Sequence, residues 1–93
     1  MTYICVHWSH DFPTEPVWLY SELDDDRWEV RKVYVFPDGA WERADRDHNT
    51  DRVELSWVQV PDLEEIASDP QFEPRKISRD EFEKAWQKAE NSN

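Results

Sequence analysis

The chain has one cysteine, no long hydrophobic run and half as many basic as acidic residues, and each shortage excludes a class of protein. Because Cys5 is the single thiol, neither an intrachain disulfide nor a cysteine-based zinc site can form. The longest apolar run has three or four residues, whereas a membrane helix needs about 20. The N-terminus lacks the basic start and apolar centre of a secretory signal. We therefore expect a soluble protein of a reducing compartment, most simply the cytoplasm.

The low content of Lys and Arg indicates which kinds of partner the protein can bind. Its 11 Lys and Arg residues stand against 22 Asp and Glu residues, which gives a formal net charge of −11. Such a charge disfavours binding to DNA, RNA or anionic lipid. It favours a basic protein partner, or it serves solubility alone, and the sign of the charge does not choose between the two.

Aromatic residues, by contrast, are plentiful: the 93 residues include six Trp, three Tyr and four Phe. Acidic disordered chains are poor in aromatic residues, so this content indicates a folded core. A chain of this length buries only about 60–65% of its unfolded surface. We expect one domain over residues 1–93 without room for a large internal cofactor cavity, and we predict no cofactor.

Five segments have the composition of β-strands. Residues 2–8 and 17–23 are rich in β-branched and aromatic residues, and residues 53–60 are a further candidate. Between them, Pro37, Asp38 and Gly39 predict the turn of a β-hairpin with arms at 28–36 and 40–44, because proline presets φ and glycine accepts a positive φ.

The third segment carries an irregularity. Trp28 and Val30 share one parity, whereas Val33 and Val35 share the other. A strand with a period of two cannot keep one face buried through such a change. Either a β-bulge at Arg31-Lys32 resets the register or both faces are partly covered, and we favour the bulge.

The last third of the chain has the period of helices. Asp62 is a predicted N-cap, with Glu65 at the capping-box position, for a short helix at about 62–69. Ser78 is the predicted N-cap of a second helix at about 79–90, in which Ile77 and Phe82 form a hydrophobic staple. The apolar stripe of this helix consists of Phe82, Ala85, Trp86 and Ala89. We predict an α+β fold: a four- to five-stranded antiparallel meander-like sheet within about 2–60, followed by a short helix and a C-terminal helix packed on the sheet.

Three stretches carry a resemblance to a known family. They are HDFPTEPV at 10–17, LYSELDDDRWEVRKVYVFPDG at 19–39 and DLEEIASDPQFEPRKISRDEFEKAW at 62–86. Together they resemble a family of small bacterial single-domain proteins of unknown function. The resemblance implies a bacterial origin and a stand-alone domain, and it implies no catalytic or binding residues.

Candidate metal sites are weak. His7, His10 and Asp11 are residue types that bind metals, but three-residue spacing on a strand directs the two histidines to opposite faces. The acidic run Asp24, Asp25 and Asp26 lacks the spaced ligands, central glycine and terminal glutamate of an EF-hand loop. We therefore predict no metal ion.

An enzyme is also the less favoured interpretation. Cys5 and His7 share a strand face, but this spacing rarely gives a nucleophile with an oriented base, so Cys5 is predicted to lie in the core. No spacing fixes the separation of the carboxylates of Glu15, Glu22 and Glu29. Glu22 and Glu29 are predicted instead to form cross-strand ion pairs, on a solvated sheet face, with the basic residues Arg27, Arg31 and Lys32.

The tryptophans and the acidic residues together indicate a binding protein. Trp28, Trp57 and Trp86 are expected in the core by pattern, whereas Trp8, Trp18 and Trp41 are harder to enclose in so small a sheet. Residues 11–26 contain six acids and no Lys or Arg. Exposed Trp and Tyr dominate binding hot spots, and acids steer basic partners. The predicted partner-binding residues are Trp18, Tyr20, Glu22, Asp24, Asp25, Asp26 and Trp41.

The function hypothesis is therefore an acidic protein-binding module or inhibitor, of the immunity-protein or nucleic-acid-mimic type, that acts on a basic partner. The alternative is a small-ligand or metal-binding domain that uses a Trp-lined cleft and His7, His10 and Asp11.

Overall fold

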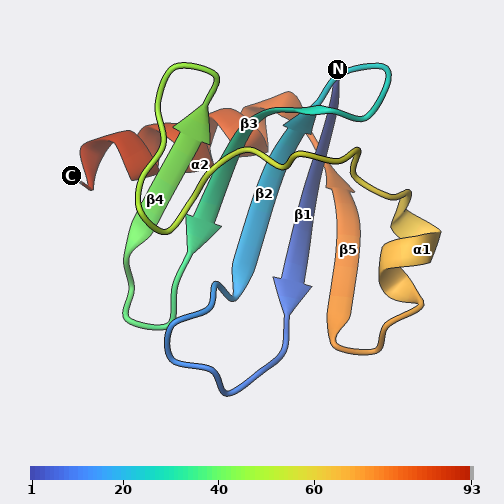
Figure 1. The fold of residues 1–93 in the computed structure, drawn as a ribbon, viewed down its shortest axis with the longest axis horizontal. Coiled ribbons are helices and arrows are strands. Elements are labelled where there is room, and N and C mark those ends of the chain that lie inside the picture. The colour runs from blue at the N-terminus through green and yellow to red at the C-terminus, as the bar shows by residue number, and fades with distance from the viewer. Residues whose placement is uncertain (93) are drawn as a thin grey trace.

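A computed structural model describes residues 1–92 and shows a five-stranded antiparallel sheet with the long helix behind it (Figure 1). The strands are β1 (Thr2–Trp8), β2 (Trp18–Leu23), β3 (Glu29–Val35), β4 (Trp41–Asp45) and β5 (Phe72–Ile77), in the spatial order β4-β3-β2-β1-β5. The helices are α1 (Leu63–Ala67) and α2 (Arg79–Asn91). The predicted α+β class is confirmed, and the first four strands form the expected meander. Neither α1 nor α2, the helices within residues 1–92, has the length and hydrophobicity of a membrane-spanning segment.

The fifth strand is not the one that the sequence pattern predicted. Residues 53–60 form no strand; they belong to a connection that crosses the sheet face opposite α2 (Figure 1). The fifth strand is β5, which lies between the two helices in sequence and pairs antiparallel with β1 at the edge of the sheet. Pro74 has no N–H to donate, which is tolerated on an edge strand but makes the segment atypical of a strand in sequence.

The irregularity in β3 is a bulge one residue earlier than predicted. Arg31 lies opposite Glu22 and Glu29 lies opposite Leu23, so Val30 is the extra residue rather than the Arg31-Lys32 pair. Both faces of the sheet are also covered, which was the other possibility. The bulge places Glu29 and Lys32 on one face, although they are three residues apart.

The predicted turn and caps are confirmed. Gly39 has a φ of 89°, and its N–H donates to the Phe36 carbonyl at 2.9 Å to close the β3–β4 turn. The Asp62 side chain accepts a hydrogen bond from Glu65 N at 2.9 Å at the start of α1. The Ser78 hydroxyl accepts one from Glu81 N at 3.1 Å at the start of α2.

One sheet face is buried by α2. Phe82 and Ala89, on the side of α2 that faces the sheet, are fully buried and pack on Tyr3, Cys5 and Val33. Cys5 thus lies in the core, as predicted, and burial raises the pKa of its thiol. A protonated thiol is a poor nucleophile, so this environment does not activate Cys5.

Ion pairs link α2 to the sheet where a solvated face was expected. Arg31 pairs with Glu22 across the strands at 2.7 Å and with Glu83 of α2. Its guanidinium lies 4.9 Å from the ring centroids of both Phe82 and Trp86. The cross-strand pair is confirmed, but α2 covers it, so the prediction of a solvated face was wrong.

Because the pKa of Glu22 is lowered in the folded protein, we expect the free energy of unfolding to fall in acid. Burial by itself raises the pKa of Glu22, but hydrogen bonds from Arg31 and Tyr3 and the charge of Arg31 outweigh it and hold the pKa below its ordinary value of 4.5. The stabilisation is therefore complete above pH 4.5 and is lost as the pH falls through the lower folded-state pKa. In urea unfolding, we expect the stability difference between wild type and Glu22→Gln to shrink as the pH falls from about 7 to about 3. A constant difference over that range, or the same trend for the exposed Glu15→Gln control, would contradict this assignment.

The opposite sheet face is covered by the 46–62 connection and α1. Ile4, Val6 and Leu23 are buried there, and the half-buried side chains of Val60 and Ile66 pack over them. A second cluster, formed by Phe36, Ala44 and Val53, anchors the connection near β4.

Candidate functional site

Two tryptophans that were expected in the core lie on the surface. Trp57 is 87% exposed, its neighbour Val58 is 67% exposed, and Trp28 is 43% exposed. The core assignment of Trp28 and Trp57 was therefore wrong. Trp57 is exposed because residues 53–60 are not a strand, and Trp28 lies before β3, next to Arg27 with its positive φ of 66°. Trp28, Trp57 and Val58 are called the aromatic patch below.

Hydrogen bonds hold the two loops of the aromatic patch against each other. Ser56 N donates to Glu29 Oε1 at 2.6 Å, and Gln59 Nε2 donates to the Asp26 carbonyl at 2.7 Å. Arg27 Nε donates to the Val60 carbonyl at 2.8 Å. Because Ser56 is hydrogen-bonded to Glu29 and Gln59 to Asp26, the segment 57–58 runs alongside Trp28.

Two open hollows, of about 390 and 510 Å³, lie beside the aromatic patch. Trp57 lines one and Trp28 lines the other. They share Leu55 and the charged residues Asp45, Arg46 and Asp47, so they form one continuous uneven surface.

Acidic side chains border the aromatic patch on the 24–26 turn. Asp24 Oδ1 accepts hydrogen bonds from Asp26 N and Trp28 N, each at 2.9 Å, and so fixes the turn. Asp25 and Asp26 are exposed. Within residues 1–92, no Lys or Arg forms an ion pair with any of the three aspartates. The negative charges of Asp25 and Asp26 are therefore directed to solvent.

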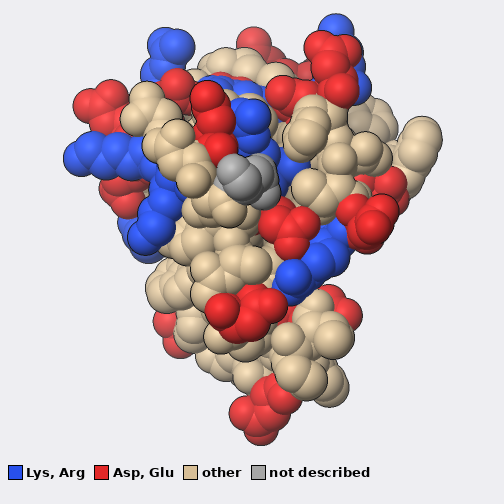
Figure 2. Space-filling view, turned by 90° about the vertical axis from the view of Figure 1, so that its left-hand side faces the viewer, with Lys and Arg blue, Asp and Glu red and all other residues tan. Residues whose placement is uncertain are grey.

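Charge is more balanced on the flank formed by β4 and the end of α2. Figure 2 shows acidic and basic side chains interspersed there. Arg43 pairs with Glu90 at 3.4 Å, and Arg52 pairs with Glu42 at 3.1 Å. The excess of negative charge is not concentrated on this flank.

The predicted partner-binding residues do not form one surface. Trp18, 37% exposed, begins β2, whereas Asp24, Asp25 and Asp26 follow the other end of this strand. Glu22, between them, is 6% exposed and paired with Arg31.

Tyr20 and Trp41 lie on the α2 face of the sheet. Their rings stack with centroids 6.2 Å apart, and Lys88 Nζ lies 4.5 Å from the centre of the Trp41 ring. Both side chains are half-buried and take part in holding the helix on the sheet.

The two histidines among the candidate metal ligands are engaged in other contacts. His10 Nδ1 accepts a hydrogen bond from Phe12 N at 2.9 Å, so Nε2 carries the proton and donates to the Pro16 carbonyl at 2.8 Å. The His7 ring packs on Trp18 with centroids 4.4 Å apart. Across residues 1–92, no three His, Cys, Asp or Glu side chains are grouped as metal ligands.

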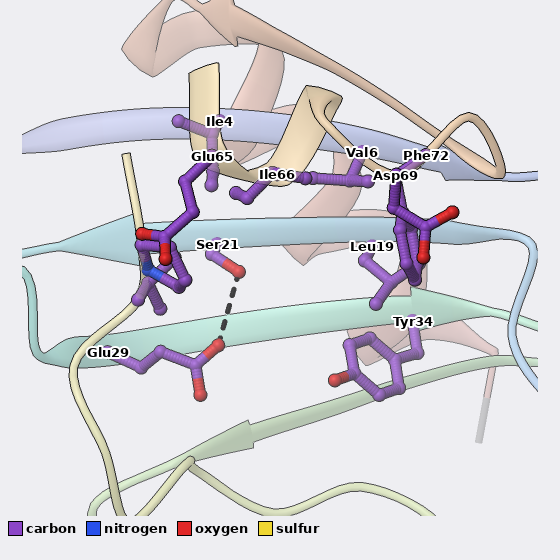
Figure 3. Close-up of a pocket in the computed structure, with 12 residues that line it drawn as sticks. Ile4, Val6, Leu19, Ser21, Glu29, Tyr34, Glu65, Ile66, Asp69 and Phe72 are labelled. Carbon is purple, nitrogen blue, oxygen red and sulfur yellow. Dashed lines mark hydrogen bonds between the residues drawn. The ribbon is translucent and has the colours of Figure 1, made fainter. Parts of the chain in front are cut away.

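A cavity that the sequence did not predict lies between α1 and the sheet. It has a volume of about 330 Å³ and is walled mainly by apolar side chains. Ser21 Oγ donates to Glu29 Oε2 at 3.2 Å at its wall (Figure 3). Neither a tryptophan nor His7, His10 or Asp11 lines it, so it is not the cleft of the alternative hypothesis.

A buried ion pair supports this wall. Lys32 Nζ lies 2.9 Å from Glu29 Oε1 and donates to the Glu54 carbonyl at 3.1 Å, and both side chains of the pair are 5% exposed. Burial by itself lowers the pKa of Lys32, but Tyr34 and Glu29 outweigh it and raise the pKa above its ordinary value. The lysine therefore stays charged. The predicted ion pair of Glu29 with a basic residue is thus present, but it lies within β3, across the bulge at Val30, and not between strands. It is buried rather than on the solvated face that was expected.

These features define an acidic α+β domain on an open antiparallel sheet, with an exposed aromatic patch and a separate apolar cavity. A family model described as a domain of unknown function (DUF6881) matches residues 2–91, and the chain belongs to this family. The expected membership of a family of unknown function is thereby confirmed, whereas the bacterial origin stays a prediction. The comparisons with curated proteins and with solved structures gave no match.

Proposed function

We propose that this protein is a protein-binding module that recognises a basic partner through the aromatic patch and the acidic turn beside it. The observation that carries the proposal is Trp57, which is 87% exposed. Its loop is joined, through the hydrogen bond from Gln59 to the Asp26 carbonyl, to the turn with the exposed carboxylates of Asp25 and Asp26. A large aromatic ring left in water costs hydrophobic free energy that a partner surface would recover.

The physical chemistry of interfaces supports the two parts of this surface in different ways. Tryptophan is enriched among the few residues that carry most of the binding free energy. Unpaired carboxylates accelerate the approach of a basic partner and align it. Hydrogen bonds from Ser56, Gln59 and Arg27 already order the two loops, so less conformational entropy is lost on binding.

The finer form of the proposal is inhibition of a basic, nucleic-acid-binding enzyme. The 24–26 turn carries three successive carboxylates, of which Asp25 and Asp26 are exposed, and so presents negative charge as a phosphate backbone does. Asp45 and Asp47 line the hollow beside Trp28 together with Arg31 and Arg46, so the excess of negative charge lies on the turn rather than in the hollow. Such a surface would compete with nucleic acid for a basic groove, and no catalytic residue is required of the chain.

The proposal predicts a loss of partner binding in Trp57→Ala. The immobilised chain is exposed to lysate of its source organism, the retained basic protein is purified, and its affinity is then measured at about 0.1 and about 0.5 M salt. We expect binding at low salt that weakens at high salt, and an affinity at least about 30-fold lower for Trp57→Ala, as for a hot-spot residue. Because Trp57 is almost fully exposed, the variant should fold like the wild type.

Trp18→Ala is the matched control, since Trp18 is also exposed but lies at the opposite end of β2. It also tests the surface predicted from the sequence. If Trp18→Ala weakens binding and Trp57→Ala does not, the partner uses the surface of Trp18, Tyr20 and Trp41 instead. Salt-insensitive binding, or retention of no basic protein, would contradict the proposal in both forms.

A further inference from the structure

The cavity between α1 and the sheet has the properties of a small-ligand site that is separate from the aromatic patch. Small-molecule sites begin at about 300 Å³. At about 330 Å³, this cavity is smaller than the two hollows beside the aromatic patch and, like them, open to solvent, but its walls are the most apolar of the three. An open apolar cavity of this size has room for a small ligand.

Helix α1, above the cavity, packs only loosely on the sheet. No residue of α1 is buried, and Leu63 and Ile66 on its inner side are only half-buried. Ile66 lines the cavity from above, whereas Ile4 and Leu19 line it from the sheet. An apolar group between these side chains would remove the exposed apolar surface of both layers from water.

All charged side chains in the cavity wall are acidic. They are Glu29, Glu65 and Asp69, and neither Lys nor Arg lines the cavity. Lys32 compensates Glu29 from outside the wall, through Oε1. Among the described side chains, only the Ser21 hydroxyl donates a hydrogen bond to Glu29 Oε2. This oxygen can therefore accept a second hydrogen bond.

The acidic side chains lie at opposite ends of the cavity. In Figure 3, Glu65 and Glu29 lie toward one end, and Asp69 and Phe72 lie toward the other. Glu65 and Asp69 are exposed and are therefore at the rim, while the walls between them are apolar.

We propose that this cavity binds a small organic cation: an apolar body that fills the space beneath Ile66 and an ammonium group that pairs with Glu65 and donates to Glu29. The apolar body supplies the burial, and the carboxylates select against neutral and anionic molecules of the same shape.

The test is an NMR titration of the labelled full chain with 2-phenylethylammonium at about 0.15 M salt. We expect shift changes at the methyl groups of Ile4, Leu19 and Ile66 with a dissociation constant of about 1 mM or lower. The neutral 2-phenylethanol should bind about tenfold more weakly, as one lost charge-assisted hydrogen bond implies. Methylammonium, which has the charge but no apolar body, should leave these methyl groups unchanged.

Adjacent glutamates of α1 give the matched variants. Glu65→Gln should weaken binding of the amine several-fold, whereas Glu64→Gln, exposed and not part of the cavity wall, should not. The proposal is overturned if 2-phenylethylammonium leaves the cavity methyl groups unchanged, if 2-phenylethanol binds equally well, or if both variants weaken binding alike. Since Trp28 and Trp57 do not line the cavity, these results do not depend on the binding of a protein partner.

Discussion

Phe82→Ala should lower the free energy of unfolding by about 3–5 kcal/mol, the cost of deleting a fully buried aromatic ring and leaving a cavity. Phe82 is 0% exposed and contacts the ring of Tyr3, with centroids 5.5 Å apart, and that of Trp86 at 6.3 Å. It also lies beneath the Arg31 guanidinium, which loses a cation–π contact in the variant.

Such a loss is large for a small domain, whose total stability is about 5–15 kcal/mol. Urea unfolding followed by tryptophan fluorescence and circular dichroism measures it. The exposed Phe12→Ala is the control, with an expected change within about 1 kcal/mol. A loss below about 1 kcal/mol for Phe82→Ala would show that α2 does not depend on this side chain for docking.

The second large effect concerns the buried pair of Glu29 and Lys32. Lys32→Met should cost about 3–5 kcal/mol, because it leaves the Glu29 carboxylate buried without its counter-charge. The double variant Glu29→Gln/Lys32→Met should be more stable than Lys32→Met alone, since no uncompensated charge is left inside. The side-chain amide of Glu29→Gln keeps one oxygen that can accept from Ser56 N, and its NH2 group can donate to the Ser21 hydroxyl.

A double-mutant cycle on urea unfolding separates this pair from its surroundings. We expect the two substitutions to be non-additive by at least about 1 kcal/mol. Arg75 and Glu81 form an exposed pair, with side chains 54% and 50% accessible, and their cycle should give a coupling of only about 0–1 kcal/mol. Additivity at Glu29 and Lys32 would mean that water, rather than the partner, compensates each charge.

The local signals of the sequence predicted the local structure well. Gly39 after Pro37 and Asp38 defines a turn through its own φ, and Ser78 with Ile77 and Phe82 defines a helix start within six residues. These features depend on neighbours in the chain, so the residues that form them are also the residues that predict them.

The surface was predicted less well, because exposure depends on residues far apart in the chain. The apolar alternation of 53–60 is compatible with a strand, but β5 occupies the free edge of β1 and leaves that segment to cross the opposite face. Trp57 consequently lies in water, whereas Trp41, between a turn and a charged residue in sequence, is half-buried against α2.

The sequence by itself determined the α+β class, the meander of the first four strands, the hairpin turn and the capped helices, because each has a short-range physical cause. Only the tertiary structure decided which edge β5 extends, where the bulge in β3 falls, and that this bulge brings Glu29 and Lys32 to one face. It also decided which tryptophans form the aromatic patch and that a cavity lies under α1. These features arise from the packing of segments that are far apart in the chain, such as Arg27 and Asp26 against Val60 and Gln59, and no local pattern encodes that packing.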